Sequence, residues 1–282
     1  MHPAGLRTKV RGFRPRWSAL QALETIRETV NAGCNHAGDT LLLGRKRRAV
    51  DPAALRQRAE AIGARHRIRI GYGAPDTFFV APDPAASAAI VGGVARAAEP
   101  SALPRALDGI EESLEIYPAG FFSTLCKAIF VCGSLTRDGA ESGGTYGPAW
   151  LILVATWEVG ERGIFETARL GVHHEFSSLV WNALPGLPAR WAALLPREWS
   201  PAGTNAEALA AGGRGADRPR DDGFLSSYGA TTVENDFNVY AETAFADAGR
   251  LVSAAARSPV VARKTAYPWR VRRRSRTSST PG

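Results

Sequence analysis

Apolar residues recur every three or four positions in several parts of the chain, which is the period of an amphipathic helix. Helices with this period are predicted at residues 17–32, 103–117 and 231–245, and a run of small residues predicts another at 86–97. A further helix is predicted from Asp51-Pro52 to about residue 64, because Asp is a good N-cap and Pro suits the first helical position. Strands are predicted at 67–72, where polar and apolar residues alternate, and in the apolar runs 128–132 and 150–155.

This order of elements predicts an α+β fold and divides the chain into four regions. They are a basic, disordered N-terminus (1–16), a helical and mixed portion (17–100), a candidate catalytic domain (101–250) and a basic, disordered tail (251–282). Residues 185–223 are rich in Pro and Gly and predict an irregular insertion within the third region.

The positive charge of the chain is concentrated at its two ends. Residues 1–16 and 248–282 together hold fourteen Lys and Arg and no acidic residue. Without them, the formal net charge of +8 becomes −6 for the residues between. Binding of nucleic acid through the basic ends is therefore the weakest of the functional hypotheses, because the predicted catalytic region is acidic.

The remaining composition is that of an ordinary globular protein. The sequence has no apolar run of 18 residues, so no transmembrane segment is predicted. Its three cysteines include no CxxC pair, and a disulfide framework is not expected. As written, the chain indicates the cytoplasm, whereas a missing N-terminal signal would indicate secretion or lipid anchoring. No particular oligomeric state is predicted.

Two histidines and a glutamate stand side by side in an apolar, helix-like stretch at residues 171–181. A hydrolytic zinc site needs three protein ligands, an open position for water, and a carboxylate that takes the proton of the water. The common helical solution is His-Glu-x-x-His, in which the two histidines are about 40° apart around the axis. His174-Glu175 supplies the first half of this motif, and Ser178 occupies the position of the second histidine.

A later helix, at residues 231–245, offers carboxylates that could complete the site. Glu234, Asp236 and Glu242 are the candidates, and Glu234 and Glu242 lie on roughly the same helix face. One of these carboxylates together with two histidines would form the two-histidine, one-carboxylate ligand set of a zinc enzyme.

An ordered set of motifs in residues 103–247 resembles the zinc-binding metallopeptidases of the gluzincin type, including the lethal-factor-like zincins. The motifs are Tyr117-Pro118, the strand ending near Leu135, the loop with Gly139 and Gly143-Gly144-Thr145, the strand 150–155, His174-Glu175-Phe176, Gly223 to Tyr228, Asp236-Phe237 and Tyr240-Ala241-Glu242. The resemblance implies a zincin-like domain, in which a small mixed sheet packs on the His-Glu helix and on the later acidic helix.

The resemblance also implies roles for single residues. His174 would be a zinc ligand, Glu175 the general base, and Tyr228 the stabiliser of the oxyanion. Two positions depart from the family pattern, since Ser178 replaces the second ligand histidine and Asn235 stands where the ligand glutamate is expected. His173 and Glu234 are the candidates to replace these two ligands.

The leading functional hypothesis is therefore a zinc-dependent metallohydrolase, specifically a peptidase acting on a peptide or protein substrate. Zn²⁺ would polarise the scissile carbonyl group, and Glu175 would deprotonate the metal-bound water. The alternative is a zincin-fold pseudoenzyme that acts as a binding or scaffold module. These two hypotheses differ in whether His174, Glu175 and one carboxylate of the later helix converge on a metal.

Overall fold

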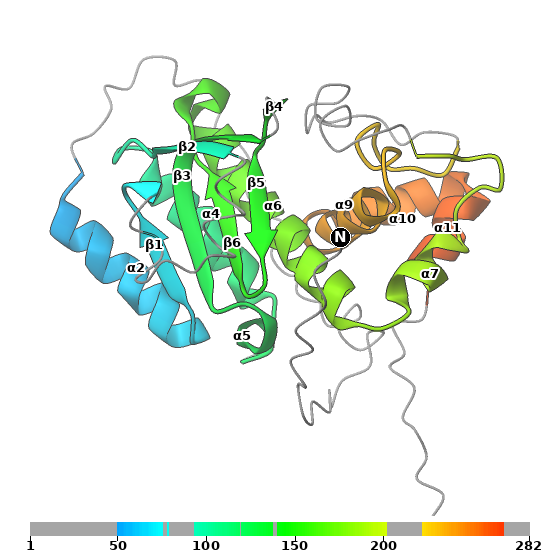
Figure 1. Ribbon diagram of the computed structural model, residues 1–282, viewed down its shortest axis with the longest axis horizontal. Helices are drawn as coiled ribbons and strands as arrows, with labels where there is room; N and C mark the ends of the chain where they lie inside the picture. The colour runs from blue at the N-terminus through cyan, green and yellow to red at the C-terminus, as the bar shows by residue number, and fades with distance from the viewer. Residues whose placement is uncertain are drawn as a thin grey trace, which may run out of the picture. The chain divides into compact units, whose positions relative to one another are not determined.

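A mixed β-sheet and the helices packed on it form the part of the protein that carries the His-Glu segment (Figure 1). The computed structural model describes residues 50–75, 78, 93–118, 120–137, 140–201 and 222–267. The elements given below all belong to one compact unit, Thr40–Ala266. The helix predicted at 17–32 lies outside the described residues.

The long strand β3 (Ala128–Arg137) is the centre of the sheet. Its first half pairs in parallel with β1 (Arg69–Tyr72) on one side and with β6 (Trp150–Val154) on the other. Its second half pairs in antiparallel with β2 (Gly93–Ala97) and with the short β4 (Ala140–Glu141). Antiparallel β5 (Gly144–Gly147) borders β6 and forms the edge of the sheet on that side.

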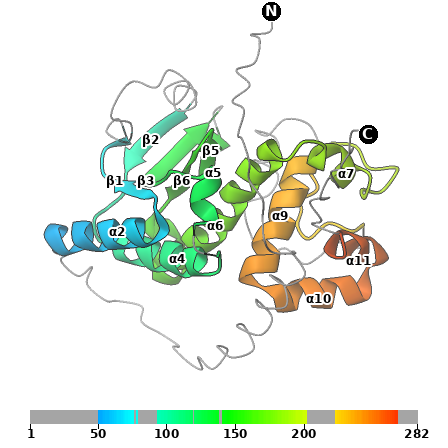
Figure 2. The ribbon, with the colours of Figure 1, turned by 90° about the horizontal axis from the view of Figure 1, so that it is seen from below.

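Helices cover one face of this sheet, as the view from below shows (Figure 2). They are α2 (Pro52–His66), α4 (Leu103–Glu115), the short α5 (Phe122–Leu125) and α6 (Gly160–Ala183), which follows the 3₁₀ turn η2 (Trp157–Val159). Alternate strand residues such as Ile129 and Val131 face these helices, whereas Phe130 and Cys132 face the opposite side, where Phe130 stacks on Phe78. This alternation follows from the two-residue period of a strand.

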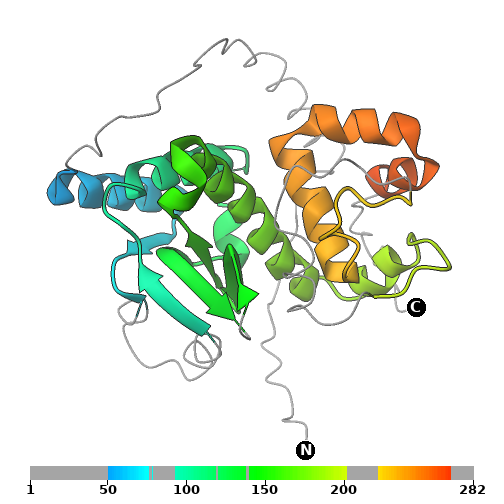
Figure 3. The same ribbon diagram turned by 90° about the horizontal axis from the view of Figure 1, so that it is seen from above.

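The described elements that follow α6 are helices, and this group packs against the C-terminal half of α6 (Figure 3). It consists of α7 (Leu187–Ala192), α9 (Val233–Ala246), α10 (Ala248–Arg257) and α11 (Pro259–Thr265). Helix α9 begins where the sequence predicts, because the Thr232 hydroxyl accepts from the backbone N–H of Asn235 at 3.0 Å and caps the helix. Helix α9 lies along α6, and one of its acidic residues, Glu242, comes close to the His-Glu segment.

The α+β class and the small mixed sheet packed on the His-bearing helix are confirmed, as are the elements predicted near 51–64, 67–72, 103–117, 128–132, 150–155 and 231–245. None of the described helices is long and apolar enough to cross a membrane.

The helix predicted at 86–97 is wrong for residues 93–97, which form β2. The small residues there satisfy a helical pattern equally well, but pairing with the second half of β3 selects the strand.

The tail predicted from residue 251 also differs from the structure over residues 251–265, which are helical. Leu251, Ala254 and Val261 are buried there, and this apolar face outweighs the basic composition that suggested a tail. In addition, β1 and β2 pair with β3, so one sheet joins residues before and after the boundary predicted at residue 100.

Candidate functional site

The His-Glu segment lies in the part of α6 that packs against both the sheet and α9. Gly171 permits a close approach, because a Cβ atom there would lie 3.0 Å from a side-chain carbon of Leu153 on β6. His174, Glu175 and Ser178 are 4%, 4% and 1% exposed. The predicted site residues of α6 are therefore interior residues.

Two hydrogen-bonded pairs, one helical turn apart, connect α6 to α9. His174 Nδ1 lies 2.8 Å from Glu242 Oε2, and Asn238 Nδ2 donates to Ser178 Oγ, also at 2.8 Å. Residues four apart share a helix face, so His174 and Ser178 meet Glu242 and Asn238 in reverse chain order. These four residues are called the polar ladder below.

Ser177 completes the hydrogen bonding of the ladder. Its hydroxyl lies 2.5 Å from Asn238 Oδ1 and 2.7 Å from the carbonyl oxygen of His174. Both ends of the Asn238 amide are thus engaged, with the oxygen toward Ser177 and the nitrogen toward Ser178. This pairing matters because a buried polar group without a partner costs about 1–3 kcal/mol.

Glu175 extends from α6 to the edge strand β5 and lies against Gly144. A Cβ atom at Gly144 would be 2.8 Å from Glu175 Oε1 and 2.9 Å from the carbonyl oxygen of Ile152. Only glycine leaves room for the carboxylate here. The predicted general base is therefore held beside β5.

Tyr228 lies over His174, with the two ring centroids 5.7 Å apart. It belongs to the segment that leads into α9 and is held by a turn, in which the backbone N–H and the hydroxyl of Thr231 both donate to the carbonyl oxygen of Tyr228. The structure thus brings together three of the predicted site residues, namely His174, Tyr228 and Glu242, whereas the Glu175 carboxylate lies against β5.

His173 points away from this group into an aromatic cluster. Its ring stacks on the Phe245 ring, with the two centroids 5.2 Å apart. Its Nδ1 lies 2.8 Å from the hydroxyl oxygen of Tyr117. Complete burial lowers the pKa of His173 to about 3, with a smaller contribution from Arg169. Adjacent helical residues are about 100° apart, so His173 does not reach the metal side of His174.

Glu234 contacts β5 and is remote from His174. Its carboxylate accepts from the hydroxyl of Tyr146 at 2.7 Å. The carboxylate is eight residues before Glu242, which corresponds to about 12 Å along a helix axis. Burial, together with the negative charge of Glu234, raises the pKa of Tyr146 to about 12, so the phenol stays protonated and donates.

Asp236 forms a buried ion pair on the side of α9 that faces α11. It is 0% exposed and lies 2.9 Å from Lys264 Nζ, and it accepts from Trp191 Nε1 at 2.8 Å. Burial raises the pKa of Asp236 and lowers that of Lys264, and in both cases the partner opposes the shift. The Asp236 carboxylate therefore links α9 to Trp191 of α7 and to Lys264 of α11.

The residue opposite Ser178 is Asn238, and not Asn235, where the resemblance expects the ligand glutamate. The Asn235 amide donates to Thr231 Oγ1 at 2.9 Å, at the capped start of the helix, one turn earlier than Asn238. Sequence reasoning missed both Asn238 and Tyr146. One signal for Asn238 was present, since Asn238 and Glu242 have the same four-residue spacing as His174 and Ser178.

The donor atoms at this site do not fit a zinc ion. His174 Nε2 is available, and its Nδ1 has a carboxylate partner of the kind that orients ligand histidines. Ser178 and Asn238, however, present a neutral hydroxyl and a neutral amide, whereas zinc sites use Cys, His and carboxylate ligands. Among the described residues, no group of three or more His, Cys, Asp or Glu side chains is arranged to hold a metal.

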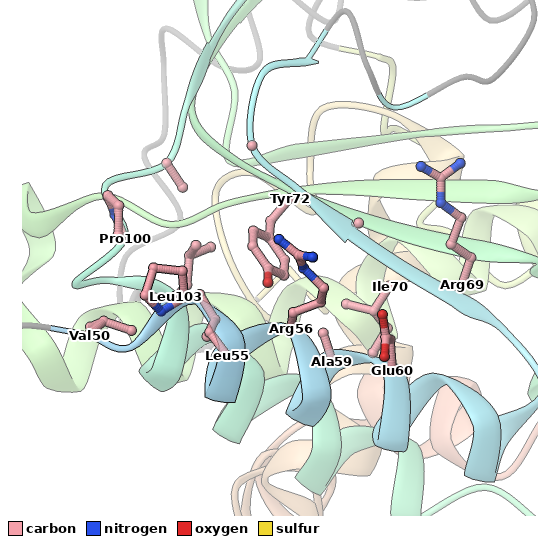
Figure 4. A pocket seen from close by; sticks show the side chains of 14 residues that line it. Val50, Leu55, Arg56, Ala59, Glu60, Arg69, Ile70, Tyr72, Pro100 and Leu103 are labelled. Carbon is pink, nitrogen blue, oxygen red and sulfur yellow. The ribbon is translucent and has the colours of Figure 1, made fainter.

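Two hollows in the described surface lie apart from the polar ladder. One, of about 460 Å³, is between α2 and β1 and is lined by residues such as Leu55, Arg56, Ile70, Tyr72 and Leu103 (Figure 4). The other, of about 590 Å³, is bordered by α6, α7 and the beginning of α9. Neither is lined by His174 or Glu175.

Comparison with known proteins adds no further identification. No protein-family model, curated protein sequence or solved structure matches this chain.

Proposed function

We propose that this protein is a metal-independent polypeptide-binding module with a zincin-like architecture. The observation that carries the proposal is the 2.8 Å hydrogen bond between Ser178 and Asn238. In a His-Glu-x-x-His site, residue 178 would supply the second ligand, and the residue facing it on α9 would supply the third. Here the two side chains satisfy each other, and only one histidine remains for a metal.

The order of elements supports the zincin-like part of the proposal. An antiparallel edge strand (β5), a parallel strand (β6), the His-Glu helix (α6) and an acidic helix (α9) follow one another along the chain. Tyr228 and Glu242 lie beside His174, in keeping with the resemblance seen in the sequence.

The edge of β5 supports the polypeptide-binding part. The backbone N–H of Val154 on β6 donates to the carbonyl of Gly143 at 3.0 Å. Because this pattern alternates along an antiparallel pair, the backbone N–H and C=O of Tyr146 point away from β6. Within the described residues they have no backbone partner, and such groups can pair with an added extended strand.

A zinc-dependent peptidase is the second candidate. The His174–Glu242 pair and the Glu175 carboxylate favour it, since both belong to the ligand and base set of a zincin site. It is the weaker candidate because Glu175 acts as a base only on a water that a metal has activated, and the donor set lacks two of the three ligands.

A degenerate library of decapeptides, passed over the immobilised full-length chain, tests the proposal. Retained peptides are quantified by mass spectrometry with zinc and with EDTA, and the flow-through is searched for cleavage products. We expect equal retention under both conditions and no cleavage. Zinc-dependent cleavage would favour the peptidase, and absence of retention would contradict polypeptide binding.

A further inference from the structure

The hollow of about 590 Å³ beside the start of α9 has apolar walls and one charged group. The walls include Trp181 of α6, Pro188 and Ala192 of α7, and Val233 of α9. Among the described residues that line it, Glu234 is the only ionisable one. Apolar pockets with a few placed polar groups are the usual form of a binding site.

The Glu234 carboxylate has no ionic partner within the described part of the chain. The Tyr146 hydroxyl donates to Oε1 at 2.7 Å, but no Lys, Arg or His nitrogen lies within ion-pair distance there. The first turn of α9 stabilises the negative charge through the helix dipole without neutralising it. As far as the described residues line it, the hollow thus presents a negative charge without an ionic partner among apolar side chains.

We infer that this hollow binds a lysine or arginine side chain of a partner polypeptide. Lys and Arg bury an aliphatic stem along apolar surface and keep the charge at its end, which matches apolar walls with a carboxylate. An acidic side chain would be repelled. An apolar side chain would remove water from Glu234 without replacing it by a counter-ion.

The inference deepens the proposed function and rests on it. Tyr146 belongs to β5, and its hydroxyl bridges to Glu234, so the hollow adjoins the edge strand where we propose that a polypeptide pairs. A strand added to β5 supplies backbone hydrogen bonds, and a side-chain pocket next to it supplies selectivity.

The test uses four decapeptide pools, degenerate at all positions except one central residue. That residue is Lys, Arg, norleucine or Glu, and norleucine matches the lysine stem without its charge. We expect the Lys and Arg pools to be retained on the full-length chain at least about tenfold more than norleucine, with the Glu pool lowest; tenfold corresponds to 1.4 kcal/mol.

The substitution Glu234→Gln should reduce the Lys-to-norleucine ratio to about one, while the Gln carbonyl keeps an acceptor for Tyr146. Glu198→Gln is the matched control, because Glu198 is an exposed carboxylate outside the hollow. This control should keep the wild-type ratio. Equal retention of all pools by the wild type would overturn the assignment of the hollow alone, whereas no retention of any pool would contradict the proposed function.

Discussion

The two adjacent histidines of α6 lie in different surroundings, although they are one residue apart. His174 pairs with Glu242 in the polar ladder, whereas His173 lies in an aromatic cluster with Tyr117 and Phe245. The difference follows from the rotation of about 100° per helical residue. His173 is therefore a core residue whose pKa is lowered by burial.

The variant His173→Gln should lose less stability than the wild type as the pH falls below 6.5. Burial lowers the pKa of His173 to about 3 from 6.5, so below pH 6.5 the unfolded chain binds a proton that the folded chain does not. The histidine therefore costs the wild type about 1.4 kcal/mol of stability per pH unit as pH falls from 6.5 toward 3.

Urea denaturation at several pH values measures this effect. Wild type and His173→Gln should have parallel profiles above pH 7 and should diverge below pH 6. Parallel profiles down to pH 4 would show that His173 is not a buried neutral group.

Removing one partner of the Asp236–Lys264 ion pair should be strongly destabilising. Lys264→Met leaves Asp236 buried without its counter-ion, and breaking a buried pair in this way costs about 3–5 kcal/mol. The double substitution Lys264→Met with Asp236→Leu should cost less, because it leaves no unpaired charge. Chemical denaturation measures both free energies of unfolding.

The neighbouring Arg263 provides the control for this pair. It is exposed, so Arg263→Met should change stability by no more than about 0.5 kcal/mol. Equal effects of Arg263→Met and Lys264→Met would contradict a structural role for the pair.

At the scale of single elements, local sequence signals predicted most helices and strands but missed pairings distant in sequence. The capped starts of α2 and α9 are local features, and both are found in the structure. Strand β2 was predicted as helix, because its partner is the second half of β3, about forty residues later. Local composition carries no information on that partner.

The close contact between α4 and α6 depends on a single glycine. A Cβ atom at Gly109 would lie 2.4 Å from the carbonyl oxygen of Phe165, which is backbone and cannot rotate away. Gly109→Ala should therefore lower stability by about 1–3 kcal/mol, as overpacking does, although Ala is the better helix former.

Gly249→Ala in α10 is the matched control for this contact. A Cβ atom there would meet its nearest neighbour at 3.6 Å, an ordinary contact. This substitution should be neutral or stabilising by up to about 1 kcal/mol. Equal stability of the Gly109→Ala and Gly249→Ala variants in thermal denaturation would contradict the close contact between α4 and α6.

The candidate site was predictable only in part, because local sequence patterns do not show which residues distant in sequence meet. His174, Tyr228 and Glu242 were candidates from the motif and the resemblance, and the structure brings them together. The spacing of Asn238 and Glu242 shows only that they share a helix face, because which residues they meet depends on the registry of α9 against α6. The resemblance places the ligand at Asn235, three residues before Asn238. The Asn235 amide donates to Thr231 Oγ1 at the start of the helix.

At the scale of the whole compact unit, α6 joins the sheet to the later helices. Its contacts with β5 and β6 hold Glu175 against Gly144, and its contacts with α9 form the polar ladder. In the zincin-like architecture that we propose, the Ser178–Asn238 pair would occupy the place of two metal ligands. Under the proposed function, this architecture serves binding rather than hydrolysis.

Zinc stoichiometry, measured by mass spectrometry on wild type and on the double variant Ser178→His with Asn238→Glu, tests this central claim most directly. The variant would place a second imidazole and a carboxylate next to His174, whose Nδ1 is already oriented by Glu242. We predict less than about 0.1 zinc per wild-type chain and about one per variant chain, lost on adding His174→Ala. About one zinc per wild-type chain, lost on His174→Ala, would contradict the account.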